Sequence, residues 1–200
     1  MKKIILASKS PRRSQLLTWA EVPFEVIASD SEENYPEGLT ASEVAIHIAK
    51  QKAISVKRLL CIDNKSTDLN ITNPCIHPIL AADTIVVLNN KIIGKPQTTE
   101  QAIFTLKELS GRIHHVITGV CILYGDKEIL FSETTIVEFQ LLTDHQIKYY
   151  VEHYKPFDKA GAYAIQEWIG VVGIKSIKGD FYNVMGLPVS RVLLELQHHE

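Results

Sequence analysis

The sequence predicts an α/β (α+β) protein in which helices flank one mixed sheet. Apolar runs of strand length alternate with segments of helical spacing, capping motifs precede several of those segments, and short polar turns join strands. A chain that mixes hairpins with strand–helix alternation favours a mixed sheet over a purely parallel one. The 200 residues, 46% hydrophobic and 22% charged, predict a single globular domain over residues 1–200.

The first elements are a strand, a helix and a second strand. The apolar run at residues 4–7 predicts a short buried strand. Ser10 is a favourable N-cap and Pro11 is favoured at the first helical position, so a helix is expected over 11–19. Residues 24–28 then predict the second strand.

An acidic, turn-rich loop over 29–39 leads into a helix. Thr40 and Glu43 match a capping box, and apolar side chains follow at helical spacing. Lys52 falls among these apolar positions, so it either extends along a core face to water or points into a cleft. Residues 63–78 are polar and rich in Asn and Pro, which predicts an exposed insertion loop without catalytic consequence.

The most apolar run, residues 79–88, predicts a strand that turns at Asn89-Asn90 into a strand at 91–93. Thr98 and Gln101 form a second capping-box match before another helix. The remaining expected elements are paired strands at 115–124 and 128–141, a helix from Thr143 to near His153, strands at 162–166 and 171–177, and a helix at 188–196.

The charge balance limits the possible partners. A net charge of −2 and a pI near 6.4 exclude a nonspecific binder of nucleic-acid polymers and leave a nucleotide ligand open. The three cysteines have no metal-ligand spacing, and sparse thiols are typical of a reducing cytosol. No signal-peptide pattern is present, and no apolar stretch approaches the ~20 residues that span a bilayer. We therefore expect a cytoplasmic protein that does not bind a membrane.

Asp83 is the most unusual residue of the apolar run 80–88. A carboxylate there costs free energy unless it is paired, hydrogen-bonded or bound to a metal. Two interpretations remain open. Asp83 is either a residue at a strand end that caps a neighbouring loop, or a general base or metal ligand at the mouth of a sheet.

Cationic and hydroxyl side chains surround the start of the first predicted helix. Ser8, Arg12 and Arg13 lie where free N–H groups and the helix dipole favour a phosphate, and arginine adds forked donors. The alternative is a solvated basic helix start.

Lys95, in Gly-Lys-Pro, and Lys159, followed by small residues, are either anion ligands or plain surface charge. Glu33 lies in the acidic loop, which is either solvated or able to bind Mg²⁺. The chain lacks the phosphate-loop, dinucleotide-turn, zinc-helix and nucleophile-elbow motifs.

Taken together, these segments resemble the Maf family of nucleotide pyrophosphatases, named for a septum-formation phenotype. The matching blocks occur in family order and cover nearly the whole chain: Leu6-Ala-Ser-Lys-Ser-Pro-Arg-Arg13, Glu32-Glu33, Ala82-Asp-Thr-Ile-Val86, Gly94-Lys-Pro96, Leu109-Ser-Gly-Arg-Ile-His-His-Val116 with Thr118-Gly-Val120, Lys159-Ala-Gly-Ala-Tyr-Ala-Ile-Gln166 and Asn183-Val-Met-Gly-Leu-Pro188. Ala164 departs from the family pattern, which usually has glycine there.

The resemblance implies a fold and an assembly. The fold expected is inosine triphosphate pyrophosphatase-like, with an elongated mixed sheet, flanking helices and two lobes around a cleft. The assembly expected is a homodimer. The resemblance also implies that Asp83 is the catalytic base and that Arg12, Thr84 and Gln166 govern the choice of substrate.

The resemblance leads to a specific mechanism. The triphosphate is expected at the start of the first helix, and the expected substrate-binding residues are Ser8, Arg12, Arg13, Lys52, Thr84, Lys95, Lys159 and Gln166. A divalent cation, Mg²⁺ or Mn²⁺, is expected to bridge phosphate oxygens and Glu33, with Asp83 as a further ligand. Asp83 would activate water for in-line attack at the α phosphorus, releasing a nucleoside monophosphate and pyrophosphate.

Thr84 after the catalytic Asp, together with the Lys159–Gln166 block, resembles the branch that hydrolyses dTTP and UTP. The cellular role expected is house-cleaning of the nucleotide pool, with a link to cell-division arrest. One alternative is a pyrophosphatase for 7-methyl-GTP or another modified nucleotide. Another is a non-enzymatic, nucleotide-binding regulator of septum formation.

Overall fold

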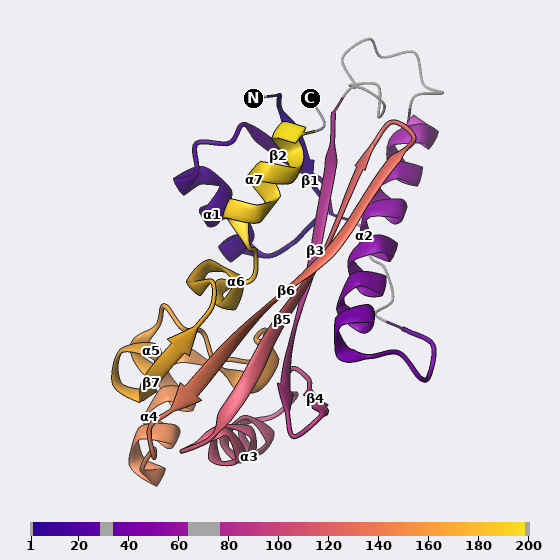
Figure 1. Cartoon of the computed structure of the whole chain (residues 1–200). Coiled ribbons are helices and arrows are strands. Elements are labelled where there is room, and N and C mark those ends of the chain that lie inside the picture. The colour runs from indigo at the N-terminus through magenta and orange to yellow at the C-terminus, as the bar shows by residue number, and fades with distance from the viewer. Residues whose placement is uncertain (1, 29–33, 64–76, 199–200) are drawn as a thin grey trace. The chain divides into compact units, whose positions relative to one another are not determined.

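The computed structural model describes residues 2–28, 34–63 and 77–198 (Figure 1). The described strands are β1 (Ile4–Leu6), β2 (Phe24–Val26), β3 (Ile79–Leu88), β4 (Lys91–Ile93), β5 (Ile113–Tyr124), β6 (Lys127–Phe139) and β7 (Ile174–Lys178). The described helices are α1 (Pro11–Trp19), α2 (Ala41–Asp63), α3 (Thr99–Leu109), α4 (Asp144–Tyr154), the 3-10 helix η1 (Ala160–Ala162), α5 (Trp168–Gly173), α6 (Phe181–Met185) and α7 (Val189–His198).

The described strands form one mixed sheet, as the sequence predicts. Its order is β2-β1-β3-β5-β6-β7, and β4 pairs with β3. β1 pairs in parallel with β2 and with β3, whereas β3–β4 and β6–β7 are antiparallel. At the β3–β4 turn, Asn89 and Asn90 both have positive φ, 50° and 63°, as a two-residue hairpin turn requires. The predicted α/β class is therefore confirmed.

Contacts divide the chain into two compact units. Unit 1 comprises residues 1–83, 118–132 and 186–200, and unit 2 comprises residues 84–117 and 133–185. The division passes through β3, β5 and β6, so each unit contains part of each of these long strands.

Unit 1 is built on the close approach of α2 to the sheet, which Figure 1 shows for the purple helix. Ala45, Ala49 and Ala53 recur every four residues on α2 and are fully buried. Opposite them, a Cβ at Gly119 of β5 would lie 2.2 Å from backbone atoms of Ala45 and Ile46. Small side chains on both elements therefore let the helix backbone rest on the strand.

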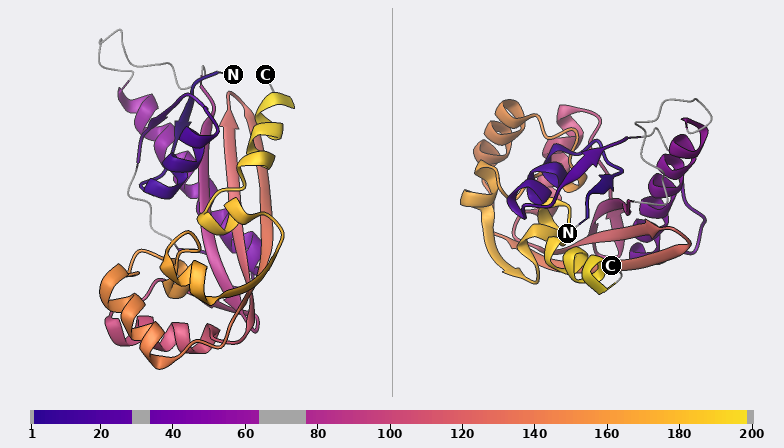
Figure 2. Two further views of the ribbon diagram at one scale, coloured as in Figure 1. Left: turned by 90° about the vertical axis from the view of Figure 1, so that its left-hand side faces the viewer. Right: turned by 90° about the horizontal axis from the view of Figure 1, so that it is seen from above.

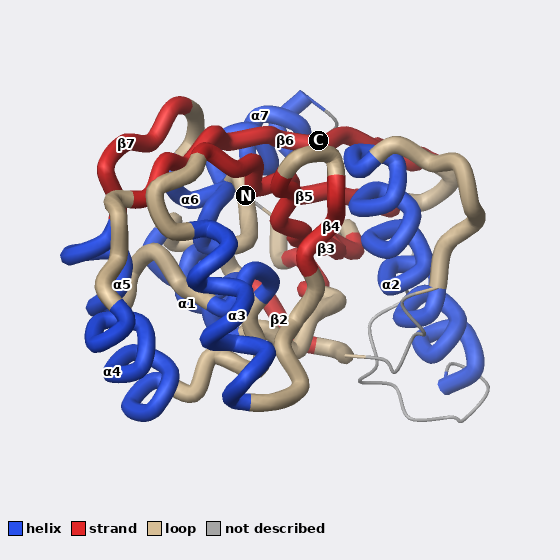
Figure 3. Tube along the Cα trace, turned by 90° about the horizontal axis from the view of Figure 1, so that it is seen from below, coloured by secondary structure: helices blue, strands red, loops and turns tan. Residues whose placement is uncertain are grey.

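Unit 2 packs its helices around a separate core. Helix α4 contacts α3 and α5, and these helices lie side by side in Figures 2 and 3. The fully or nearly buried side chains of this unit include Leu106, Leu109, Phe139, Ile147, Tyr150, Val151 and Ile169. Asn183 of α6 is also buried, and its amide donates to Val116 O at 3.1 Å and to Thr135 Oγ1 at 3.0 Å.

The capping predictions differ in outcome. Thr40 with Glu43 makes the predicted reciprocal capping box, and Thr143 with Gln146 makes a further one at the predicted start of α4. Thr98 makes half of one, because Gln101 Oε1 accepts from the N–H of Gln97 instead. Ser10 occupies the N-cap position of α1, but its side chain makes no cap hydrogen bond.

The strand predicted at 162–166 is wrong. Gly161 and Ala162 have φ of 71° and 58°, which turn the chain into η1. A second turn then forms at 164–167, where Glu167 N donates to Ala164 O at 3.1 Å. A Cβ at Gly170 would lie 1.7 Å from Ile165 O, so glycine lets α5 fold back onto this turn.

The strand predicted at 171–177 is half wrong, because residues 168–173 form α5 and β7 begins at Ile174. Helix α6 was not predicted at all. Most of the insertion predicted at 63–78, together with Glu33, lies outside the described residues. Among the residues described, no helix has both the length and the apolar character needed to cross a membrane.

Candidate functional site

Unit 1 holds Ser8 and Arg13 in a buried arrangement at the start of α1. Ser8 follows β1, and its Oγ accepts from the N–H of Ser10 at 3.1 Å and from Nη1 of Arg13 at 3.2 Å. Arg13 Nε donates to Gly186 O at 2.8 Å, which ties α1 to the segment before α7. Arg13 therefore holds the loop at Ser8 against the first turn of α1. The half-buried Arg12 lies one residue nearer to the N-terminus of this helix.

Asp83 is paired with Lys52, although 31 residues separate them in the sequence. Lys52 Nζ lies 2.5 Å from Asp83 Oδ1, and the two side chains are only 16% and 10% exposed. Lys52 therefore points from the apolar face of α2 to a carboxylate on β3. This pairing explains how both charges are accommodated next to the core of unit 1.

Parallel pairing places Asp83, in the middle of β3, level with the chain that leaves the carboxyl end of β1 toward α1. The register pairs Leu6 with Leu80, so Ser8 and Asp83 come two and three residues after a paired position. Ligands of α/β sheets characteristically bind beyond the carboxyl ends of parallel strands. Unit 1 thus combines a helix N-terminus, hydroxyl and guanidinium donors, and a buried carboxylate.

The expected divalent cation would need ligands in addition to the described carboxylate of this site, Asp83. Among residues 2–28, 34–63 and 77–198, no group of three or more His, Cys, Asp or Glu side chains gathers as a metal cage. Mg²⁺ is commonly held by one or two carboxylates together with phosphate oxygens and water. Asp83 offers one such carboxylate, and the predicted second ligand, Glu33, lies outside the described residues.

Unit 2 brings three predicted segments together. A Cβ at Gly161 would lie 2.9 Å from Val86 Cγ2, and Gly161 N donates to Gly94 O at 3.3 Å. The chain after Lys159 therefore packs on β3 and on the turn that carries Lys95. Thr84 is half-buried and shares a face of β3 with Val86, because side chains alternate along a strand.

Lys159 is paired more heavily than the sequence suggested. It is 7% exposed, and its Nζ lies 2.7 Å from Asp158 Oδ1 and 3.5 Å from Glu167 Oε1. Two carboxylates thus accompany one ammonium. Sequence reasoning missed both partners, although a lysine among small buried residues does call for a counter-charge.

Gln166 is exposed on the turn at 164–167, beside a buried anchor. Tyr163 packs against Phe139, and its hydroxyl lies 2.7 Å from His114 Nε2. Burial, the larger cause, and neighbouring His115 lower the pKa of His114 to about 4, and burial raises the pKa of Tyr163. Both side chains are therefore neutral near pH 7, so the anchor carries no charge.

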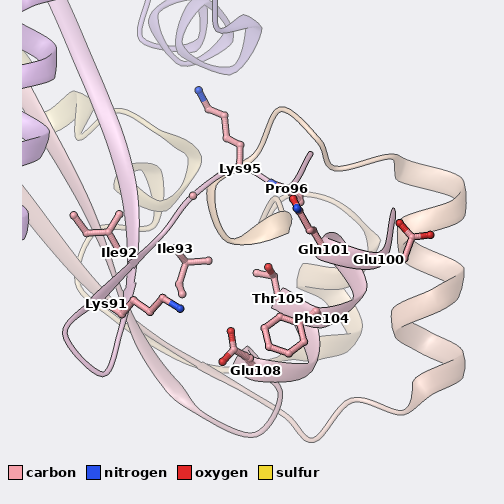
Figure 4. Close-up of a pocket in the computed structure, with 11 residues that line it drawn as sticks. Lys91, Ile92, Ile93, Lys95, Pro96, Glu100, Gln101, Phe104, Thr105 and Glu108 are labelled. Atoms are coloured by element: carbon pink, nitrogen blue, oxygen red, sulfur yellow. The ribbon is translucent and has the colours of Figure 1, made fainter. Parts of the chain in front are cut away.

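A groove of about 440 Å³ lies between β4 and α3 in unit 2. It is lined by Lys91, Ile92, Ile93, Gly94, Lys95, Pro96, Glu100, Gln101, Phe104, Thr105 and Glu108. Figure 4 shows Lys95 directed away from the other lining side chains. The groove contains two carboxylates and exposed Phe104, so it does not have the chemistry of a triphosphate site.

With this geometry in place, the comparisons with known proteins identify the family. The model of the family described as Maf-like protein matches residues 3–199, nearly the entire chain. The chain belongs to the Maf family. The resemblance carried by the sequence blocks is thereby confirmed.

Relatives within the Maf family are close. The chain is 50% identical to a Cytophaga hutchinsonii protein named dTTP/UTP pyrophosphatase, over 97% of this chain and 83% of that protein. Proteins of the same name from Parabacteroides distasonis and Porphyromonas gingivalis are 44% and 42% identical, each over 98% of this chain and 95% and 93% of theirs.

A solved structure is a more distant match. The Staphylococcus aureus Ham1 protein aligns at 17% identity over 69% of this chain and 72% of that chain, with a TM-score of 0.42. A similarity at this level does not establish the expected inosine triphosphate pyrophosphatase-like lobes and cleft, which stay a prediction.

Proposed function

We propose that this Maf-family chain is a nucleoside triphosphate pyrophosphatase that converts dTTP and UTP to the monophosphate and pyrophosphate. The observation that carries the chemistry is the buried Lys52–Asp83 pair, in which Asp83 lies level with the residues between β1 and α1. The choice of substrate is supported by relatives at 42–50% identity that are named dTTP/UTP pyrophosphatase.

In this proposal Asp83 acts as the general base. Its carboxylate accepts a hydrogen bond from Lys52, which fixes its orientation, and it takes the proton of the water that attacks the α phosphorus. The α–β phosphoanhydride bond breaks, and pyrophosphate leaves. The N-terminus of α1, Ser8 and Arg12 bind phosphate oxygens, while Arg13 holds this loop in place.

A divalent cation, Mg²⁺ or Mn²⁺, supplies charge neutralisation on the phosphates when bound. Asp83 and Glu33 would be its protein ligands. In unit 2, Thr84 and Gln166 contact the pyrimidine edge, because a hydroxyl and an amide can each donate and accept hydrogen bonds. Exposed Lys95 contacts the phosphates, and the paired Lys159 supports the segment that carries Gln166.

The deciding experiment is pyrophosphate release from a panel of dTTP, UTP, CTP, dATP, GTP and 7-methyl-GTP, with Mg²⁺, with Mn²⁺ and with EDTA. The expected result is metal-dependent hydrolysis of dTTP and UTP that EDTA abolishes. Activity confined to 7-methyl-GTP would keep the chemistry and overturn the role of Thr84. Binding without turnover would instead favour the nucleotide-binding regulator.

We propose a homodimeric, cytoplasmic enzyme that removes unwanted pyrimidine nucleotides, with any effect on septum formation arising through the nucleotide pool. Light scattering on the purified chain tests the dimer. A monomeric protein with full activity would refute that part of the proposal alone.

A further inference from the structure

The turn that carries Gln166 is closed by its own backbone. Glu167 N donates to Ala164 O at 3.1 Å, so residues 164–167 form a four-residue turn. Ile165 is 5% exposed, whereas Gln166 is exposed at the tip. The direction of the Gln166 side chain therefore depends on how the turn is held.

One hydroxyl bonds both ends of this turn. Tyr150, on α4, is fully buried, and its Oη accepts from Ala164 N at 3.1 Å. The same hydroxyl donates to Glu167 Oε2. Ala164 is the first residue of the turn and Glu167 is the fourth, so a single side chain spans the base of the turn and leaves its tip exposed.

The neighbouring segments hold the turn from two further sides. The other carboxylate oxygen of Glu167 lies 3.5 Å from Lys159 Nζ. On the side of α5, Gly170 N donates to Glu167 O at 2.9 Å, and a Cβ at Gly170 would meet Ile165 O. Ala164 itself has no positive φ, so the alanine in place of the usual glycine fits this geometry without strain.

We propose that Tyr150 is a positioning residue for substrate selection. Its hydroxyl orients the 164–167 turn so that Gln166 presents its amide to the pyrimidine edge. The inference rests on the proposed function, in which Gln166 contacts the base. Tyr150 itself touches no substrate, and it acts through the hydrogen bonds to Ala164 and Glu167.

The test compares Tyr150→Phe with Tyr154→Phe. Tyr154 lies one turn later on α4, is 36% exposed, and stacks on Tyr150 with ring centroids 5.0 Å apart. Both variants lose one hydroxyl from the same helix, but only the first removes the bonds to the turn. Steady-state kinetics with dTTP and with CTP give kcat and KM for each protein.

Tyr150→Phe is expected to lower the dTTP-over-CTP ratio of kcat/KM by about 10-fold, because the turn that carries Gln166 loses both hydrogen bonds to the Tyr150 hydroxyl. The loss should lie mainly in the KM for dTTP. Tyr154→Phe should match wild type. Glu167→Gln keeps an acceptor for the Tyr150 hydroxyl and should retain most of the discrimination.

Hydrogen exchange at the Ala164 amide provides a readout that does not need catalysis. It should accelerate in Tyr150→Phe and not in Tyr154→Phe. Unchanged exchange, or accelerated exchange with unchanged discrimination in an active enzyme, overturns the role of Tyr150. A wild-type protein that turns over no pyrimidine triphosphate overturns the proposed function itself, and so the two failures are distinguishable.

Discussion

Lys52 and Lys159, both predicted to bind substrate, have different carboxylate partners among the described residues. In unit 1, the Lys52 ammonium pairs with the Asp83 carboxylate. In unit 2, Lys159 meets two, Asp158 and Glu167, and the group is net negative. A cation that is already overcompensated attracts phosphate weakly, so Lys159 is suited to holding its loop. Lys52, in contrast, is suited to orienting a reactive carboxylate.

The largest effect is expected from Asp83→Asn in unit 1. The amide keeps the shape of the side chain but cannot accept the proton of water, so kcat for dTTP should fall by about 1,000-fold, within the range for loss of a general base. Circular dichroism and thermal unfolding check that the variant is folded. Near-wild-type turnover by a folded variant would show that Asp83 is not the base.

Replacing each lysine with methionine tests the difference between Lys52 and Lys159, because methionine keeps most of the length of the lysine side chain. Lys52→Met leaves a carboxylate at 7% exposure without its ammonium, and kcat should fall by about 100-fold, as when one preorganised electrostatic contact is lost. Lys159→Met should lower kcat by less than about 10-fold on the same scale. Equal losses of kcat in the two variants would remove the distinction between the two lysines.

A third prediction uses the neutral anchor of unit 2. His114 has a pKa of about 4 when folded against a reference of 6.5, so the unfolded chain takes up the proton first as the pH falls. The contribution of neutral His114 to the free energy of unfolding is therefore complete above pH 6.5 and is lost progressively between pH 6.5 and pH 4. From pH 7 to pH 5 the free energy of unfolding should fall by about 2 kcal/mol from this residue.

Urea unfolding of wild type and of His114→Gln at pH 7 and at pH 5 measures this pH-dependent contribution of His114 to the free energy of unfolding. The variant loses the titrating group, so its stability should change less between pH 7 and pH 5 than that of wild type. Parallel pH dependence in the two proteins would show that another group causes the loss.

The sequence predicted features that depend on neighbours along the chain. The capping box at Thr40, the helix start at Thr143, the Asn89-Asn90 hairpin and the first strand–helix unit follow from local signals, and all are present. Asp83 was singled out because a carboxylate in an apolar run needs a partner. The sequence did not reveal that Lys52 is that partner, because 31 residues separate the two and only the packing of α2 on the sheet brings them together.

The wrong secondary-structure predictions in unit 2 concern features that neighbours along the chain do not reveal. A strand was expected at 162–166, but the positive φ of Ala162 and the fold-back at Gly170 produce turns instead. An alanine in that backbone region is uncommon and has no sequence signature. The sequence did not single out Tyr150 either, because a tyrosine on the apolar face of a helix is usually interpreted as a residue of the hydrophobic core.

The smallest effect compares the capping boxes of the two units. Thr143→Ala in unit 2 removes a box closed by neutral Gln146 and should cost about 1 kcal/mol of stability.

In unit 1 the box is closed by Glu43, whose pKa is lowered by hydrogen bonds from the Thr40 hydroxyl and N–H. A lowered carboxyl pKa means that this stabilisation is present above pH 4.5 and is lost as the pH falls further. The stability difference between wild type and Thr40→Ala should therefore shrink below pH 4.5, while that for Thr143→Ala stays constant. Chemical unfolding of the three proteins from pH 6 to pH 3.5 measures both differences, and a pH-independent Thr40→Ala difference would refute the role given to the Glu43 charge.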